Sequence, residues 1–295
     1  MGNIVFLGVY RRKKMFYPQY VPLVRVFFKS KFDMSFSLTV IGCGSATPVG
    51  HRLSSAFALR CRQRVFMLDC GEGSQMYLKD NHIHMQRISK VFISHLHGDH
   101  FFGLVGLISS MHLFGRKHQL TVYAPPALEQ IVRYQLEVGG TELNYPLSFV
   151  ATRTDGCDLL FEDQELQVFS FPLRHSVPTT GFLFREKAKE RAVSPPKSFA
   201  YCSDTAYEES IIPYISGVDL LYHEATFLEN ERQLAEDRLH ATAEQAAKMA
   251  RLAGVKKLLL GHFSARYAAL EPFIEEAQRC FPDVMLASEG LTVNV

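Results

Sequence analysis

The stretch Ser94-His95-Leu96-His97-Gly98-Asp99-His100 decides how this chain is interpreted. Its pattern, H-x-H-x-D-H, places three imidazoles and one carboxylate close together. Crowded histidines compete for protons and carry an electrostatic cost unless an ion is held between them. Nitrogen and oxygen donors of this kind suit borderline-soft divalent ions such as zinc. The stretch therefore predicts a metal site, and a polar loop that holds three histidines by chance is the less favoured interpretation.

The flanking residues predict a strand before the motif and a buried helix after it. Residues 90–94 are apolar and β-branched, and residues 101–114 repeat apolar side chains at helical spacing. Because His95 and His97 are two positions apart, they face the same way in an extended segment. Asp99 and His100 come where the chain turns into the helix, so they can serve a second ion beside the first.

The composition is that of an ordinary globular chain. It has 295 residues, of which 47% are hydrophobic and 21% are charged, enough for one large domain or two small ones. No apolar run of about 18 residues appears, so no transmembrane helix is expected. The six cysteines form no C-x-x-C pair, which indicates a reduced, cytoplasmic chain without a structural zinc site of the cysteine type.

Basic charge is concentrated in residues 1–33, which hold seven basic side chains and one acidic one although the whole chain has a net charge of only +2. The remainder is mildly acidic, so any contact with nucleic acid must come from local patches. Residues 1–33 lack clean periodicity, and we predict an N-terminal basic extension outside the core fold. An extra β-element packed on the body is the alternative. The core is expected to span 34–295.

One event recurs along this core: an apolar strand delivers a His, Asp or Glu at its C-terminal end. Sites in layered α/β proteins gather at such strand ends, so the recurrence predicts one shared rim of ligands. It occurs at His95, His175, Asp204, Glu224 and His262. Strands are expected at 36–41, 65–70, 120–124, 166–173, 198–203, 218–222 and 257–260, and helices at 126–138 and 242–252.

These residues resemble the metallo-β-lactamase superfamily and, within it, the ribonuclease Z (tRNA 3′-processing endonuclease) family. The resemblance covers roughly residues 37–295 and implies an α/β fold, a single-domain αββα sandwich with two sheets face to face and helices outside. Its general marks are residues 94–100, 68–73, His175, Ser203-Asp204-Thr205 and Gly261-His262. More specific are residues 42–48, His223-Glu224-Ala225-Thr226, Leu239-His240-Ala241-Thr242 and His262-Phe263-Ser264-Ala265-Arg266-Tyr267.

The resemblance also implies a role for each matching position. Glu224 would orient His240, which would protonate the leaving oxygen, and Asp99 would accept the proton of the nucleophile. Arg266 would hold a phosphate, Arg52 would keep one contact to the RNA, and Asp69 would orient a ligand histidine. Two alternatives stay open. His240 could simply be a residue beside a helix cap at Thr242, and Arg266 could be a salt-bridge partner within the protein. The metal ligands would be His95, His97 and His175 for one zinc ion, Asp99, His100 and His262 for the other, and Asp204 bridging both.

The chain departs from the family pattern in two places. The family carries a long arm between the third ligand motif and the bridging aspartate, whereas His175 and Asp204 are only 29 positions apart here. Residues 185–197 therefore indicate a shortened, basic arm region, and tight tRNA binding is not implied. The loop after Pro48 lacks the family's lysine, so discrimination against a CCA end is not predicted either.

The leading hypothesis is a zinc-dependent endoribonuclease that removes the 3′ trailer of precursor tRNA by two-metal phosphodiester hydrolysis. It would hold two zinc ions per chain and form a homodimer, as the family does. A second hypothesis is a phosphodiesterase of the same superfamily that acts on another nucleic acid or a small phosphodiester. A third is a non-catalytic, metal-bound RNA-binding protein, which the intact ligand set together with Glu224 and His240 disfavours.

Overall fold

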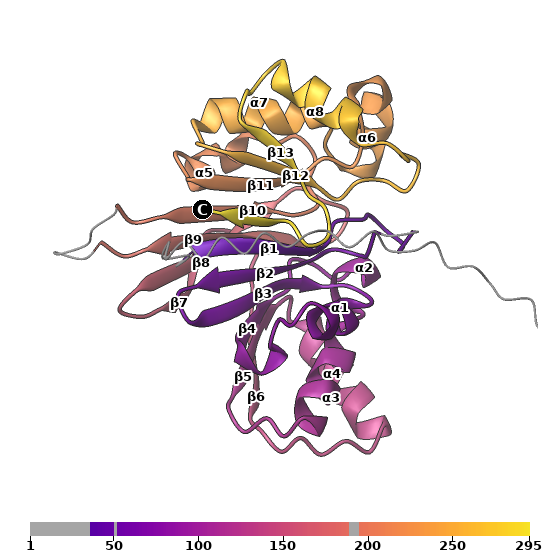
Figure 1. Cartoon of the computed structure of the whole chain (residues 1–295), viewed down its shortest axis with the longest axis vertical. Helices are drawn as coiled ribbons and strands as arrows, with labels where there is room; N and C mark the ends of the chain where they lie inside the picture. Colours follow the sequence, from indigo (N-terminus) through magenta and orange to yellow (C-terminus); the bar gives the residue numbers. More distant parts are fainter. Residues whose placement is uncertain (1–35, 50–51, 189–194) are drawn as a thin grey trace, which may run out of the picture. The chain divides into compact units, whose positions relative to one another are not determined.

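Two seven-stranded sheets form the framework of the computed structural model, which describes residues 36–49, 52–188 and 195–295 (Figure 1). The first sheet contains β1 (Phe36–Gly42), β2 (Ala56–Cys61), β3 (Arg64–Cys70), β4 (Ile88–Phe92), β5 (Leu120–Ala124), β6 (Leu147–Ala151) and β14 (Thr292–Asn294), in the order β14-β1-β2-β3-β4-β5-β6. The second contains β7 (Asp158–Glu162), β8 (Leu166–Leu173), β9 (Thr179–Glu186), β10 (Ser198–Cys202), β11 (Leu220–Glu224), β12 (Leu258–Gly261) and β13 (Val284–Leu286), in the order β13-β12-β11-β10-β9-β8-β7.

Helices lie on the outer faces of these sheets, which confirms the predicted αββα sandwich (Figure 1). Those associated with the first sheet are α1 (Ser74–Asp80), α2 (Gly98–Phe101), α3 (Leu104–Leu113) and α4 (Ala127–Val138). Those associated with the second are α5 (Ile212–Ile215), α6 (Arg232–Arg238), α7 (Ala243–Ala253) and α8 (Glu271–Gln278). No helix of the described residues is long and apolar enough to cross a membrane.

The apolar core has two layers, and alternate residues of β3 belong to different layers. Phe66 and Leu68 pack between the sheets, whereas Val65 and Met67 pack beneath the helices of the first sheet. Successive side chains of a strand point to opposite faces, so a strand covered on both faces contains a continuous apolar run. Phe66 meets Phe184 of the second sheet at a ring-centroid distance of 6.1 Å, which joins the two sheets directly.

Most predicted elements are present. The strand predicted at residues 90–94 is β4 at Ile88–Phe92, and two further differences concern a helix and a strand end. The single helix predicted over 101–114 is wrong, because α2 ends at Phe101 and α3 begins at Leu104. Between them, the Gly103 N–H donates to the Cys70 carbonyl at 2.9 Å, and a Cβ at Gly103 would lie 2.1 Å from the Gly71 oxygen. This contact with the end of β3 interrupts the helix. The other difference is that the strand predicted to stop at residue 222 continues through Glu224.

The connection between β9 and β10 is narrow where the structure describes it. The Glu186 N–H donates to the Lys197 carbonyl at 2.9 Å, and the Lys197 N–H donates to Glu186 Oε2 at 3.0 Å. The two strands are therefore still paired on either side of residues 189–194, which lie outside the described residues. The shortened arm region predicted at 185–197 spans this connection and stays a prediction. The extension predicted for residues 1–33 also lies outside the described residues and stays a prediction.

A buried carboxylate joins the beginnings of β10 and β11. Asp219 accepts hydrogen bonds from the N–H and hydroxyl of Ser198 at 2.8 and 3.0 Å, and from the ammonium groups of Lys256 and Lys197 at 2.8 and 3.3 Å. Burial by itself would raise the pKa of Asp219, but Lys256 and Ser198 outweigh it and hold the pKa below its ordinary value. The charged carboxylate is therefore held better in the folded chain than in the unfolded one.

We expect Asp219→Asn to lower the free energy of unfolding at pH 7 by about 2 kcal/mol, because hydrogen bonds to a charged group are lost. A folded-state pKa below the unfolded value gives stability that is present above about pH 4 and is lost as the pH falls further. The difference between variant and wild type should shrink accordingly in thermal unfolding measured from pH 7 downward. Asp80→Asn, at an exposed position of α1, is the control. A pH-independent difference would contradict the assignment.

Candidate metal centre

The structure brings all seven predicted ligands together at one edge of the sandwich, where strands of both sheets end. Strands β3, β4 and β5 run parallel to one another, as do β10, β11 and β12. Their C-terminal ends deliver polar side chains to a common rim, as in other layered α/β proteins. His95 and His97 follow β4, Asp99 and His100 lie in α2, and His175, Asp204 and His262 follow β8, β10 and β12.

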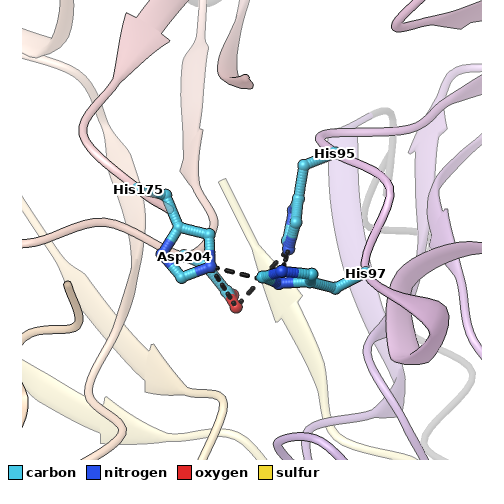
Figure 2. A group of neighbouring side chains, drawn as sticks. All are labelled: His95, His97, His175 and Asp204. Atoms are coloured by element: carbon cyan, nitrogen blue, oxygen red, sulfur yellow. Dashed lines mark hydrogen bonds and ion pairs between the residues drawn. The ribbon is translucent and has the colours of Figure 1, made fainter. Parts of the chain in front are cut away.

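The first group consists of His95, His97, His175 and Asp204, whose side chains point toward one another (Figure 2). His97 Nδ1 lies 3.1 Å from His95 Nε2 and 3.2 Å from His175 Nε2. Asp204 Oδ2 is 3.6 Å from His95 Nε2 and 3.7 Å from His175 Nε2. Donors placed about 2.0–2.1 Å from a tetrahedral zinc ion are roughly 3.3 Å apart, so the spacing of this group fits such an ion.

The second group consists of Asp99, His100 and His262. The Nε2 atoms of His100 and His262 are 3.2 Å apart, and Asp99 Oδ2 lies 3.5 Å from each. Asp204 faces this group with its other oxygen, since Oδ1 is 3.4 Å from His100 Nε2 and 3.2 Å from His262 Nε2. The carboxylate of Asp204 thus lies between the two groups with one oxygen toward each.

The hydroxyls of Ser94 and Thr226 set the tautomers of two ligand histidines. Ser94 Oγ donates to Asp69 Oδ2 at 2.9 Å and so accepts from His95 Nδ1, also at 2.9 Å. Thr226 Oγ1 donates to Glu224 Oε2 at 2.7 Å and so accepts from His262 Nδ1 at 2.9 Å. With the proton on Nδ1, the lone pair of Nε2 faces the centre in both rings. Such outer contacts orient metal ligands and raise their basicity.

Asp69 forms the largest of these outer networks. Its carboxylate is fully buried and accepts from the Ser94 N–H at 2.8 Å and from the Tyr201 hydroxyl at 2.7 Å. His100 Nδ1 lies 2.7 Å from Asp69 Oδ2, so Asp69 orients His100 and stands outside the ligand groups. This position agrees with the role expected from the sequence.

Four residues around the centre have a left-handed backbone although none is glycine. They are Ala46, Asp69, Leu239 and His262, with φ between 49° and 63°. This conformation is sparsely populated by residues with a Cβ and costs of order 1 kcal/mol or more at each position. Two of these residues supply backbone groups to the site: the Ala46 N–H donates to Asp99 Oδ2 at 2.7 Å, and the Leu239 carbonyl accepts from His175 Nδ1 at 2.9 Å.

The charge pattern of the ligands suits a cation. Burial raises the pKa of Asp204, but the imidazoles of His262 and His100 outweigh it and hold the pKa well below its ordinary value. Burial and the neighbouring His100 lower the pKa of His95, which keeps that ring neutral. His100 goes the other way, since Asp204 and Asp69 overcome its burial and raise its pKa. A divalent ion would compete with that proton.

Glu224 and His240 form a pair beside the second group. Glu224 is fully buried, and its Oε1 accepts from His240 Nδ1 at 2.7 Å and from the Thr205 N–H at 3.0 Å. Burial lowers the pKa of His240, but the Glu224 carboxylate outweighs it and raises the pKa to about 9. Because Nδ1 is engaged, Nε2 is the nitrogen left for a substrate. Thr242 does cap α7, as expected, but it does so independently of His240.

A cleft of about 380 Å³ opens over the centre. His97, Asp99, Asp204, His240 and His262 line it, so ligands from both groups and the proton-donating candidate reach the same space. The remaining walls come from residues 45–47, Gly98, Glu72 and Phe102.

The two predicted arginines lie beside this cleft rather than in its walls. The Arg266 side chain is 44% exposed, its Nη1 is 3.6 Å from Glu231 Oε2, and its guanidinium lies over the Phe227 ring. Arg52 is only 7% exposed and donates from Nη2 to the Tyr267 carbonyl at 2.5 Å. Arg52 therefore supports the loop that carries Arg266, and contact of either arginine with substrate stays a prediction.

Sequence reasoning missed two contributors, the Thr226 hydroxyl and the Leu239 carbonyl. Thr226 lies in the family motif His223-Glu224-Ala225-Thr226, and this place in the motif could have indicated its role. Nothing in the sequence marks a leucine carbonyl as a histidine partner. His223, which belongs to the same motif, is buried, and its Nδ1 donates to the Glu224 carbonyl at 2.7 Å.

Comparison with known proteins places the chain in a family. Residues 64–263 match the model of the beta-lactamase superfamily domain. The ribonuclease Z of Parabacteroides distasonis is 38% identical over 301 residues, a match that covers 88% of this chain and 99% of the relative. The ribonuclease Z of Azobacteroides pseudotrichonymphae is 41% identical over 285 residues, with the same coverage of both chains.

A solved structure agrees with these relatives. The short form of human tRNase Z aligns with a TM-score of 0.73 and 30% identity, covering 87% of this chain and 98% of the human one. The matched regions include both ligand groups, and the His and Asp cluster is that of a divalent-metal centre. The chain belongs to the ribonuclease Z family of the metallo-β-lactamase superfamily.

Proposed function

We propose that this protein is a cytoplasmic, zinc-dependent endoribonuclease that removes the 3′ trailer from precursor tRNA. The observation that carries the proposal is the position of Asp204 between two ligand groups, in a cleft that is also lined by His240, whose Nδ1 Glu224 holds. The names of the relatives, ribonuclease Z and tRNase Z, support the choice of substrate. We further propose two zinc ions per chain, because each ligand group has the spacing of one such ion.

When bound, a pair of divalent ions supplies an activated water and neutralises charge on a phosphoryl oxygen. Asp99 accepts the proton of the attacking water, since its charged carboxylate lies on the cleft wall and is fixed by the Ala46 N–H. His240 donates a proton from Nε2 to the leaving oxygen while Glu224 holds its Nδ1. Arg266, on the neighbouring loop, holds a phosphate of the RNA.

A second candidate function is hydrolysis of another nucleic acid or of a small phosphodiester. The narrow β9–β10 connection favours it, because the long arm of the family is missing there. The match to the Parabacteroides relative spans 301 residues yet covers only 88% of this 295-residue chain, so that relative has residues with no counterpart here. The non-catalytic alternative is disfavoured by the His240–Glu224 pair, which binding alone does not require.

Zinc-loaded protein should cut precursor tRNA once, at the junction between the mature tRNA and its trailer. Mapping the cut on substrates with and without CCA in the trailer tests this directly. Removing the metal with a chelator should abolish cleavage, zinc should restore it, and elemental analysis should find about two zinc ions per chain. Asp99→Ala should be inactive. Turnover of a small chromogenic phosphodiester with precursor tRNA left intact would contradict the proposal and favour the second candidate.

His240→Ala should lower kcat for precursor tRNA by roughly 10²–10⁴-fold, the usual contribution of a positioned general acid, with zinc content unchanged. Glu224→Gln should lower kcat by a smaller factor, because His240 keeps its position and loses the charge that stabilises its protonated form. His118→Ala, at an exposed position away from the cleft, is the matched control. Equal kcat in wild type and His240→Ala would remove His240 from the mechanism.

We also propose a homodimer that forms through α4. Ile131, Tyr134 and Val138 are spaced along one face of this helix, with 36%, 66% and 70% of their surfaces exposed. An apolar stripe exposed on a helix marks a surface where another molecule can bind, and a second copy of this chain is the partner that we propose.

Light scattering should find a mass of twice 33.5 kDa for the wild type and 33.5 kDa for Tyr134→Glu, because a charge would be buried without a partner in the interface. Leu252→Glu on α7, where a leucine is 49% exposed, should leave the mass unchanged. A monomeric wild type would contradict the proposal.

A further inference from the structure

Phe102 lies on the cleft wall and has no part in the chemistry described above. Its side chain is 59% exposed. A Cβ built on Gly98 would lie 2.1–2.7 Å from three atoms of the Phe102 ring, so the ring rests directly against Gly98. Gly98 stands between His97 of the first ligand group and Asp99 of the second. The aromatic ring therefore packs on the one residue that separates a ligand of the first group from a ligand of the second in the sequence.

Close backbone packing fixes Phe102 in this place. A Cβ on Gly71 would lie 2.4 Å from the backbone carbonyl oxygen of Asp99, and one on Gly103 would lie 2.1 Å from the backbone carbonyl oxygen of Gly71. These glycines let the turn after β3 press against the junction of α2 and α3. The turn carries Glu72 and the junction carries Phe102, so both side chains line the same cleft.

The pair has the chemistry of a nucleobase site rather than of a phosphate site. A single exposed aromatic residue is ordinary on a protein surface, but here the ring borders a cleft whose other walls are mostly polar. The exposed carboxylate of Glu72 would repel a phosphate and would attract hydrogen-bond donors. A base offers both a flat face and donor groups, and unpaired RNA bases are commonly bound by stacking on aromatic side chains.

We propose that Phe102 is the stacking platform for a nucleobase next to the scissile phosphate, and that Glu72 accepts a hydrogen bond from the same nucleotide. The proposal rests on the proposed function and specifies how that site holds single-stranded RNA. Stacking on an aromatic ring tolerates any base, so it suits a cleavage site whose neighbouring nucleotides vary among substrates.

A binding measurement tests the platform without relying on activity. The probe is a precursor tRNA with the fluorescent base 2-aminopurine placed on either the 5′ or the 3′ side of the cut, added to zinc-loaded His240→Ala protein to slow cleavage. Binding should quench the fluorescence at one of the two positions. Combining Phe102→Ala with His240→Ala should abolish the fluorescence quench, whereas combining Phe102→Trp with His240→Ala should keep it. Phe114→Ala, which removes a phenylalanine that is 61% exposed at the end of α3, is the matched control and should keep it.

Kinetics provide a second measurement. Phe102→Ala should lower kcat/KM for precursor tRNA roughly 10-fold to 100-fold, as expected for the loss of one stacked base. Phe102→Leu should behave like Phe102→Ala, because it fills the space without offering an aromatic face. On a precursor that lacks the base at the quenched position, wild type and Phe102→Ala should cut equally well. Zinc content and thermal midpoint should be the same in all variants.

The outcomes separate this proposal from the function on which it rests. If wild type fails to cut precursor tRNA, the proposed function is wrong, and the same fluorescent base in a bound single-stranded RNA still decides whether Phe102 stacks. If wild type cuts and Phe102→Ala keeps both the quench and the kcat/KM, the platform is wrong and the function stands. Wild-type behaviour of Phe102→Leu would also overturn the proposal, since apolar packing alone would then suffice.

Discussion

The buried carboxylate of Asp69 is the interaction on which the site depends most. It comes from β3 of the first sheet, yet it accepts a hydrogen bond from the hydroxyl of Tyr201 in β10 of the second sheet. On its own side it binds Ser94 and His100. A buried charge without partners costs several kcal/mol, so the arrangement in which all these donors converge is strongly favoured. Asp69 thereby fixes the relative position of the two sheets immediately beside the metal ligands.

Backbone strain is concentrated around the same place. Of the six non-glycine residues with positive φ in the described part of the chain, Ala46, Asp69, Leu239 and His262 belong to the centre. Each conformation is unfavourable by itself and persists only where its surroundings impose it. The hydrogen bonds of Asp69 and of the Leu239 carbonyl impose these conformations. The strained backbone therefore lowers the stability of the fold, and in return the imidazole rings are oriented without a bound ion.

How far the sequence could anticipate this site depends on distance along the chain. His95, His97, Asp99 and His100 are close together, so their spacing was enough to indicate a metal. The recurring strand ends predicted that His175, Asp204 and His262 share a rim with these residues. Their division between two ions required the family resemblance, because it depends on the strand order of the second sheet, with β12 beside β11 and β11 beside β10.

Other features arise only from tertiary contacts. The break between α2 and α3 depends on Gly103 meeting the Cys70 carbonyl, a contact that helical periodicity does not encode. The burial of Arg52 likewise depends on the Tyr267 carbonyl, more than 200 positions away, and this support of a loop is a contact that the sequence does not indicate. Strand β14 has only three residues and is defined by its pairing with β1 rather than by a pattern of its own.

Each ligand group draws on both sheets, and this links metal binding to the folding of the sandwich. The first group takes His95 and His97 from the first sheet and needs Asp204 from the second, while the second group needs His262 from the second sheet. Neither sheet alone holds a complete set, so an ion binds tightly only when the sheets are packed together, and its binding free energy stabilises that packing. Aromatic contacts such as Phe92 with Phe182, 5.4 Å between ring centroids, hold the same interface. The ligand atoms are only 3.1–3.7 Å apart, so a small shift of one sheet against the other would separate them. The core between the sheets therefore determines the geometry of the metal centre as well as the stability of the fold.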